Sequence, residues 1–107
     1  MRIIASLLFL ALAGPAAAQS IVSPSGATRE PYGCEVRGLD PNGDGFLAVR
    51  SGPGTNYRKI AELYNGDAAF MDRACQGRWC YFEGAVQNGR RTNLRGWIYD
   101  AWCSFYP

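Results

Sequence analysis

The residue types that most often carry catalysis are scarce in this chain of 107 residues. It contains no histidine, so neither a Ser-His-Asp triad nor an imidazole general base can form. Acidic side chains can supply the carboxylate pair of a glycoside hydrolase, but each candidate also suits a solvated turn or strand surface. The candidates are Asp44, Glu62, Asp67, Asp72, Glu83 and Asp100. We therefore predict that the protein is not an enzyme and has no catalytic residues and no cofactor, with a small carboxylate-based hydrolase as the minor alternative.

The first eighteen residues have the pattern of a secretory signal peptide. Arg2 precedes an uncharged apolar run, Ile3–Ala13, and small residues follow before a cleavage site expected after Ala18. The run has about half of the ~20 residues that a membrane-spanning helix needs, so a membrane anchor is the weaker alternative. We expect a chain that is secreted or periplasmic and that has no membrane span after cleavage.

The chain without this leader carries almost no net charge. Loss of Arg2 leaves ten basic and nine acidic side chains, and these are spread along the sequence. Binding to a phosphate backbone or to anionic lipid depends on concentrated positive charge. We therefore expect no nucleic-acid partner.

The four cysteines are predicted to form disulfides, because a signal peptide directs the chain to an oxidising compartment. A zinc site usually needs closely paired cysteines or histidine ligands, whereas Cys75 and Cys80 are five positions apart and histidine is absent. We expect no metal ligands.

Four cysteines allow three pairings. Cys75 and Cys80 flank a short turn at 76–78, where hairpin partners face each other, and this favours a bridge between them.

Residues 40–45, Asp-Pro-Asn-Gly-Asp-Gly, match the first half of an EF-hand calcium loop. The match then fails, because the twelfth loop position falls on Ser51, where a bidentate Glu is needed, and Pro41 argues against a flanking helix. Asn-Gly and Asp-Gly steps favour tight turns. We predict a polar turn before the first long strand, with weak calcium binding as the alternative.

The remaining sequence predicts a small all-β domain with an arm in front of it. Residues 19–33 are rich in Ser, Pro, Gly and Thr and are expected to form a flexible N-terminal arm. Residues 34–107 contain about five short segments with strand-like alternation, separated by Gly-containing turns and without a helical period. The segments are Leu47–Arg50, Ile60–Leu63, Ala68–Cys75, Trp79–Glu83 and Arg95–Tyr99, with Cys34–Val36 as a short first strand.

Three connecting segments complete the predicted domain. Gly84–Leu94 is expected to be a long polar loop, Asp100–Cys103 a short helical turn and Ser104–Pro107 a brief tail. Short strands joined by glycine turns are typical of a small antiparallel barrel. The predicted fold class is therefore an all-β, disulfide-stapled barrel.

Two segments carry a resemblance to a known family: Leu47–Tyr57, LAVRSGPGTNY, and Gly96–Tyr99, GWIY. A short strand that ends in an R-S-G-P-G turn with a Tyr after it, followed by strands that close on a G-W-I strand, resembles the bacterial SH3-like (SH3b) domain. The resemblance covers residues 45–103. It implies an SH3-like barrel of about five strands that acts as a binding module. It also implies that the ends of the barrel come close together, so that Cys34 and Cys103 can pair.

Aromatic side chains are the strongest candidates for binding. A domain this small cannot bury all of its Tyr and Trp residues, and partly exposed ones bind Pro-rich peptides or glycans by stacking and hydrogen bonding. Alternation places Trp79 and Tyr81 on one face of their strand. The resemblance points to Tyr57 as a ligand-facing residue. Arg50 either holds the adjacent turn through carbonyl hydrogen bonds, which we favour, or contacts a carboxylate. The candidate ligand-binding residues are Arg50, Tyr57, Trp79 and Tyr99.

The resemblance implies a function at the bacterial envelope. We expect a monomeric, non-catalytic module whose ligand is cell-wall (peptidoglycan) peptide or glycan. The alternative is a periplasmic protein–protein adaptor or inhibitor that presents a loop of the barrel, such as Gly84–Leu94, to its partner.

Overall fold

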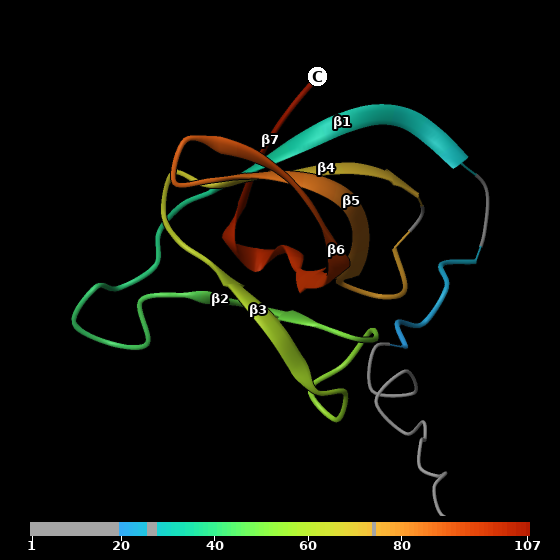
Figure 1. The fold of residues 1–107 in the computed structure, drawn as a ribbon, viewed down its shortest axis with the longest axis horizontal. Coiled ribbons are helices and arrows are strands. Elements are labelled where there is room, and N and C mark those ends of the chain that lie inside the picture. The colour runs from blue at the N-terminus through green and yellow to red at the C-terminus, as the bar shows by residue number, and fades with distance from the viewer. Residues whose placement is uncertain (1–19, 26–27, 74) are drawn as a thin grey trace, which may run out of the picture.

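The computed structural model describes residues 20–25, 28–73 and 75–107, and the predicted signal peptide lies outside these ranges. The described chain forms seven antiparallel strands in one sheet, in the order β3-β2-β6-β5-β4-β1-β7 (Figure 1). A 3-10 turn, η2 (Asp100–Trp102), lies between the last two strands. The strands are β1 (Thr28–Val36), β2 (Leu47–Arg50), β3 (Lys59–Leu63), β4 (Ala68–Arg73), β5 (Trp79–Gln87), β6 (Arg90–Tyr99) and β7 (Cys103–Tyr106).

The sheet wraps around one hydrophobic core. Leu47 and Leu63 enter this core from β2 and β3, at one end of the strand order. Cys34 and Met71 enter it from β1 and β4, near the other end. Figure 1 shows β2 and β3 crossing below the layer formed by β1, β4 and β5. The predicted class, a small antiparallel all-β barrel, is confirmed, with seven strands in place of about five.

Alternation of side chains builds the strand β2, as the sequence predicts. Leu47 and Val49 are buried, whereas Ala48 and Arg50 are half-buried on the opposite face. At the crossing of β2 and β6, Gly96 lets the two backbones approach. A Cβ atom at this position would lie 2.7 Å from Cγ1 of Val49 and 3.0 Å from the carbonyl oxygen of Arg50. The glycine therefore places the outer faces of β2 and β6 side by side.

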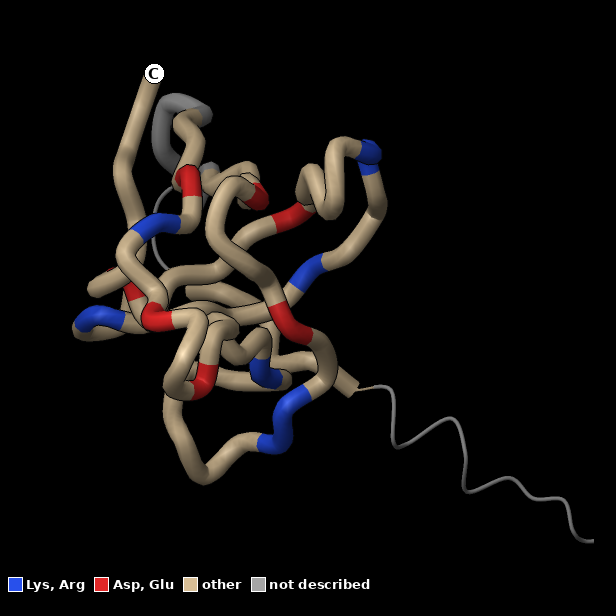
Figure 2. Tube along the Cα trace, turned by 90° about the vertical axis from the view of Figure 1, so that its left-hand side faces the viewer, with Lys and Arg blue, Asp and Glu red and all other residues tan. Residues whose placement is uncertain are grey.

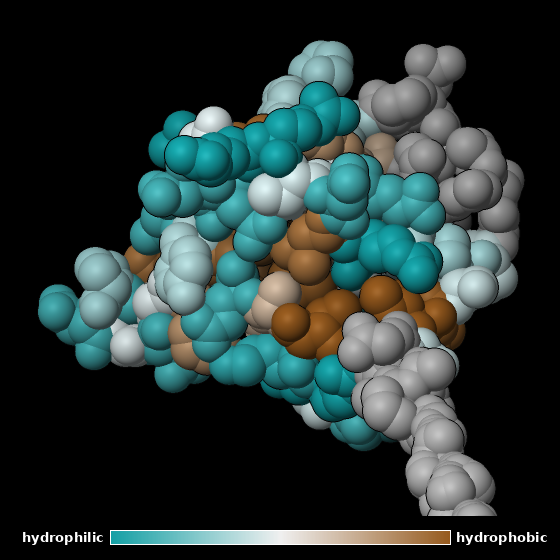
Figure 3. Space-filling model, viewed as in Figure 1, coloured by the Kyte–Doolittle hydropathy of each residue, from teal (hydrophilic) through white to brown (hydrophobic). Residues whose placement is uncertain are grey.

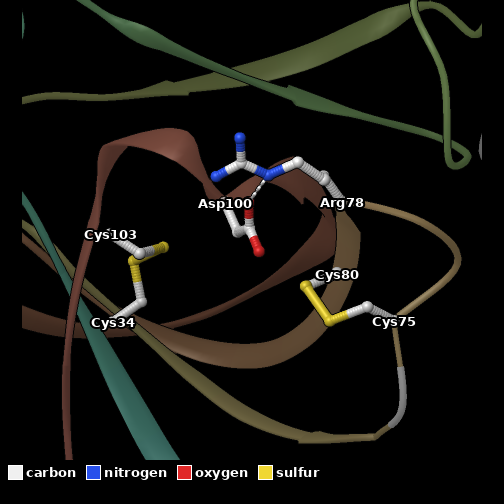
Figure 4. The surroundings of a disulfide bond; sticks show 6 residues. All are labelled: Cys34, Cys75, Arg78, Cys80, Asp100 and Cys103. Atoms are coloured by element: carbon white, nitrogen blue, oxygen red, sulfur yellow. Dashed lines mark hydrogen bonds and ion pairs between the residues drawn. A yellow bond between two sulfur atoms is a disulfide. The ribbon is translucent and has the colours of Figure 1, made fainter.

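Both disulfides have the predicted pairing. Cys34 of β1 is bonded to Cys103 of β7, with the two Cα atoms 5.0 Å apart. Cys75 is bonded to Cys80 of β5, with the Cα atoms 4.2 Å apart. Figure 4 shows the two bridges in separate parts of the barrel. The first spans a sequence separation of 69 and fastens the last strand to the first.

The prediction of a long polar loop over Gly84–Leu94 is wrong. The strands β5 and β6 continue as a hairpin as far as the pair Gln87 and Arg90. Asn88 and Gly89 form the turn between them, and both have positive φ angles, 53° and 78°. A two-residue hairpin turn of type I′ requires this conformation and favours the Asn-Gly step.

Both ends of the domain contain more strand than the sequence predicts. The strand β1 begins at Thr28, inside the range expected to be a flexible arm, and pairs with β4 and β7. Most of the expected tail Ser104–Pro107 belongs to β7, which pairs with β1. The helical turn expected at Asp100–Cys103 is confirmed by η2.

The segment Asp40–Gly45 forms the predicted polar turn. The backbone N–H of Gly43 donates to the carbonyl oxygen of Asp40 at 3.0 Å, and that of Asn42 donates to Oδ1 of Asp40 at 2.9 Å. Over the ranges that the structure describes, no group of three His, Cys, Asp or Glu side chains is placed to hold a metal ion. Over the same ranges, no helix has the length and apolar character to cross a membrane.

Candidate ligand-binding cleft

An aromatic stripe runs along the outer face of β5 and β6. It consists of Trp79 and Tyr81 from β5 and of Trp97 and Tyr99 from β6. Trp79 is paired across the strands with Tyr99, and Tyr81 with Trp97. The ring centroids within these pairs are 5.4 Å and 5.5 Å apart, and both pairs have edge-to-face geometry. The predicted sharing of one face by Trp79 and Tyr81 is confirmed, and Trp97 and Tyr99 share a face of β6 in the same way.

The two halves of the aromatic stripe differ in exposure. Tyr81 and Trp97 are 1% and 0% exposed, whereas Tyr99 is 37% exposed and Trp79 is half-buried. A cleft of about 530 Å³ lies over the exposed half. We call it the aromatic cleft. Its aromatic walls are Phe46, Trp79, Tyr99 and Trp102, and its charged lining residues are Asp44, Arg50 and Lys59.

Three separate segments build the aromatic cleft. Phe46 comes from the turn before β2, Trp79 and Tyr99 come from the β5–β6 hairpin, and Trp102 comes from η2, which follows β6 directly. Trp102 is 41% exposed, and its ring packs beside Gly38, where a Cβ atom would lie 3.7 Å from it. The cleft therefore depends on the barrel fold, because no single strand supplies its walls.

Arg78 and Asp100 hold Tyr99 in place from the side. The guanidinium of Arg78 lies over the ring of Tyr99, with its central carbon 5.2 Å from the ring centroid. Its Nε donates to Oδ1 of Asp100 at 2.6 Å (Figure 4). This hydrogen bond raises the pKa of Arg78 above its ordinary value. The pair links the start of β5 to the start of η2, on either side of Tyr99.

Arg50 has the role that the sequence analysis favours for it. Its Nη1 donates to the carbonyl oxygen of Tyr57 at 3.0 Å and so closes the loop of residues 51–57. Its Nε is buried and has no hydrogen-bond partner among the described residues. The side chain of Arg50 also lines the aromatic cleft. The same guanidinium group therefore holds the loop and contributes positive charge to the cleft.

Tyr57 lies outside the aromatic cleft. Its side chain is half-buried against the loop that precedes it, and it is not among the residues lining the aromatic cleft. A Cβ atom at Gly52 would lie 2.4 Å from Cδ1 of Tyr57, so the ring packs directly on the backbone of the R-S-G-P-G turn. The structure thus brings Arg50, Trp79 and Tyr99 together in the cleft and leaves Tyr57 out.

Lys59 stands at the rim of the aromatic cleft. Its Nζ lies 4.4 Å from the ring centroid of Phe46 and forms an ion pair with Glu62. The hydrogen bond from Lys59, followed by one from Tyr64, lowers the pKa of Glu62 below its ordinary value. Lys59 is therefore a cation near an aromatic wall, and Glu62 offsets part of its charge.

Four of the six acidic residues considered for catalysis have separate structural partners. Glu62 accepts from Lys59, Glu83 accepts from the hydroxyl of Tyr81, and Asp100 accepts from Arg78. Asp67 accepts from two backbone N–H groups, and Asp44 lines the cleft. The side chain of Asp72 lies outside the described part of the chain. The aromatic cleft therefore offers aromatic rings for stacking and charged side chains for ionic contacts with a ligand.

Sequence reasoning missed part of this site. Phe46 and Trp102 each lie just outside a predicted strand, and their contribution depends on how the loop before β2 and the turn η2 are packed. An available clue is that Trp102 is a large aromatic residue in a short turn at the end of the last predicted main strand, where full burial is difficult.

The chain matches no protein-family model, no curated protein and no solved structure.

Proposed function

We propose that the aromatic cleft is a non-catalytic binding site for cell-wall peptide or glycan, in a small binding module of the SH3b type at the bacterial envelope. The observation that carries this proposal is the cleft itself, in which four aromatic side chains and two cations from separate segments meet at one open surface. Two of its walls, Tyr99 and Trp102, are more than one-third exposed. Aromatic rings at an open surface stack on sugar rings and on apolar groups of peptides.

The charged lining of the cleft suits a ligand with both carboxylate and amide groups. Lys59 and Arg50 attract carboxylates, and Asp44 accepts hydrogen bonds from amide or ammonium groups. Peptidoglycan peptides carry all of these groups next to a glycan strand. Figure 2 shows acidic and basic residues interspersed over the described chain, which supports a ligand of mixed charge over a polyanion.

The proposed location follows from the leader and from the disulfides. Residues 1–18 have the pattern of a signal peptide, and all four cysteines are paired. Stable disulfides are typical of secreted and periplasmic proteins. We infer that the protein acts there as a monomer.

A second candidate function is binding to another protein of the envelope. The observation that favours it is the exposed surface of the edge strand β7, where Phe105 and Tyr106 are 50% and 40% exposed. A sheet edge with exposed aromatic residues is a common protein-binding surface. This candidate predicts that binding depends on β7 and not on the aromatic cleft.

Co-sedimentation with purified peptidoglycan sacculi tests the proposal. We expect the chain to pellet with sacculi, and Tyr99→Ala to weaken its binding by about fivefold, because a stacking aromatic contact contributes on the order of 1 kcal/mol. Tyr106→Ala is the matched control, since both tyrosines are similarly exposed but Tyr106 lies on β7. Retention that neither substitution changes would contradict the cleft as the binding site. Absence of retention would favour a protein partner.

A further inference from the structure

Residues 20–25 lie against the buried half of the aromatic stripe. The N–H of Val22 donates to the carbonyl oxygen of Ser51 at 2.7 Å. The carbonyl oxygen of Val22 accepts from Nε1 of Trp97 at 2.9 Å. Both polar backbone groups of one residue are thus bound by the barrel, and Trp97 is fully buried.

The contact of this segment with the barrel differs from strand pairing. Residues 20–25 belong to none of the seven strands of the sheet. Ile21, Val22 and Pro24 are half-buried, whereas the three serines of the segment are exposed. In the view of Figure 3, apolar side chains form a patch that extends towards the side on which this segment lies in Figure 1. The segment is therefore bound as an extended peptide is bound, through its backbone and through half-buried apolar side chains.

We propose that the carbonyl oxygen of Ser51 and Nε1 of Trp97 form a binding site for extended peptides, and that an extended segment of a partner protein competes there with residues 20–25. The site has a hydrogen-bond acceptor, a donor and an aromatic floor made of Trp97 and Tyr81. It recognises the N–H and C=O of a single residue, so the partner segment needs a residue other than proline in the place of Val22, with an apolar side chain because that of Val22 is half-buried.

The peptide site continues the aromatic cleft. Trp97 is the strand partner of Arg50, and Ser51 follows Arg50 in the chain. Arg50 in turn lines the cleft and holds the loop that contains Ser51. Displacement of the segment would extend the open part of the aromatic stripe from Trp79 and Tyr99 to the second aromatic pair. The peptide site does not depend on which ligand the cleft binds.

The covalent tether determines how this competition appears in experiment. Because residues 20–25 are part of the same chain, they act at a high effective concentration, and a free peptide must exceed it. A peptide in trans therefore binds weakly to the wild-type chain. It binds more tightly when the contact of the chain's own segment has been weakened.

The test uses Val22→Pro in the chain without residues 1–18, because proline lacks the N–H that donates to Ser51. Ser23→Pro is the matched control, since Ser23 is exposed and its N–H donates no hydrogen bond to the barrel within the described ranges. The probe is a synthetic hexapeptide with the sequence of residues 20–25, acetylated and amidated. The readout is the indole N–H resonance of Trp97 in NMR spectra.

We expect Val22→Pro to shift the Trp97 resonance, and we expect the hexapeptide to reverse this shift saturably. The hexapeptide should bind to the Val22→Pro chain at least tenfold more tightly than to the wild type or to Ser23→Pro. A folded Val22→Pro chain, with both disulfides intact by mass, whose Trp97 resonance is unchanged or does not respond to the peptide would overturn the proposal.

A measurement on wild type covers the case in which the variant fails to fold. The Trp97 indole N–H should exchange with solvent at least tenfold faster than the backbone N–H of Ile98, because the segment opens locally. Equal exchange rates would also refute the proposal.

Discussion

Removal of the Cys34–Cys103 bridge is expected to lower the free energy of unfolding by about 4 kcal/mol, against about 2 kcal/mol for the Cys75–Cys80 bridge. The physical reason is the size of the loop that each bridge closes in the unfolded chain. The two sequence separations are 69 and 5. The longer loop loses more conformational entropy on closure, so its bridge destabilises the unfolded state more.

The two bridges offer a matched comparison. Each joins one fully buried cysteine, Cys34 or Cys80, to one that is partly exposed, Cys103 or Cys75. Replacement of both cysteines of a bridge by alanine therefore removes similar buried groups in the two double variants. Urea denaturation of both variants under identical conditions gives the comparison. Equal unfolding free energies, or a greater loss for the short bridge, would contradict the loop-entropy account.

Substitution Asp67→Ala is expected to cost about 3 kcal/mol of stability, which is large for an acidic residue. Asp67 is 7% exposed, and its Oδ2 and Oδ1 accept from the backbone N–H groups of Tyr64 and Asn88 at 2.9 Å and 3.0 Å. Each N–H that loses its acceptor in a partly buried place costs about 1–3 kcal/mol. Asp67 thus joins the turn before β4 to the turn between β5 and β6.

Two further variants separate this role from a general effect of losing an acidic side chain. Asp67→Asn keeps one acceptor oxygen and should cost about half as much as Asp67→Ala. Asp40→Ala removes an exposed carboxylate that accepts only a local hydrogen bond from Asn42, and should cost less than about 1 kcal/mol. Chemical denaturation of the three variants gives the order. A loss for Asp67→Ala no greater than that for Asp40→Ala would show that the two turns are not held through this carboxylate.

Much of the fold is predictable because its pattern is local. Leu47 and Val49 alternate with less apolar residues, and the structure buries this pair as predicted. The pairing of Cys75 with Cys80 depends on a short turn, which sequence spacing indicates directly. Glycine- and asparagine-rich steps likewise indicate the turn at Asp40–Gly45.

The predictions are wrong for segments whose structure depends on pairing with another part of the chain. Residues 84–94 are mostly polar, and their strand character depends on the hairpin turn at Asn88-Gly89, a step that favours a two-residue turn. β7 is a strand because Cys103 is held beside β1, and the residues of the strand alone give little indication of this. Val22 is bound through its backbone N–H and C=O groups. Nearly every residue type has these groups, so the sequence does not indicate this contact.

The candidate site was predictable only in part. Trp79 and Tyr99 share a face because of simple alternation, and the cross-strand pair that they form follows from it. The position of Tyr57 depends on how a loop of glycine and proline folds back, and the ring packs on Gly52 instead of lining the cleft. Trp102 enters the cleft through a 3-10 turn whose direction the sequence does not reveal.

An NMR titration of the 15N-labelled chain with solubilised peptidoglycan fragments tests the central claim most directly. The sequence has three tryptophans, and each indole N–H gives one resonance that single Trp→Phe variants assign. Trp79 and Trp102 line the aromatic cleft, whereas Trp97 is buried beside Val22. We predict saturable shifts of the Trp79 and Trp102 resonances at one common affinity, with the Trp97 resonance unchanged. Absence of shifts at Trp79 and Trp102, or a shift of Trp97 alone, would contradict a cell-wall ligand in the aromatic cleft.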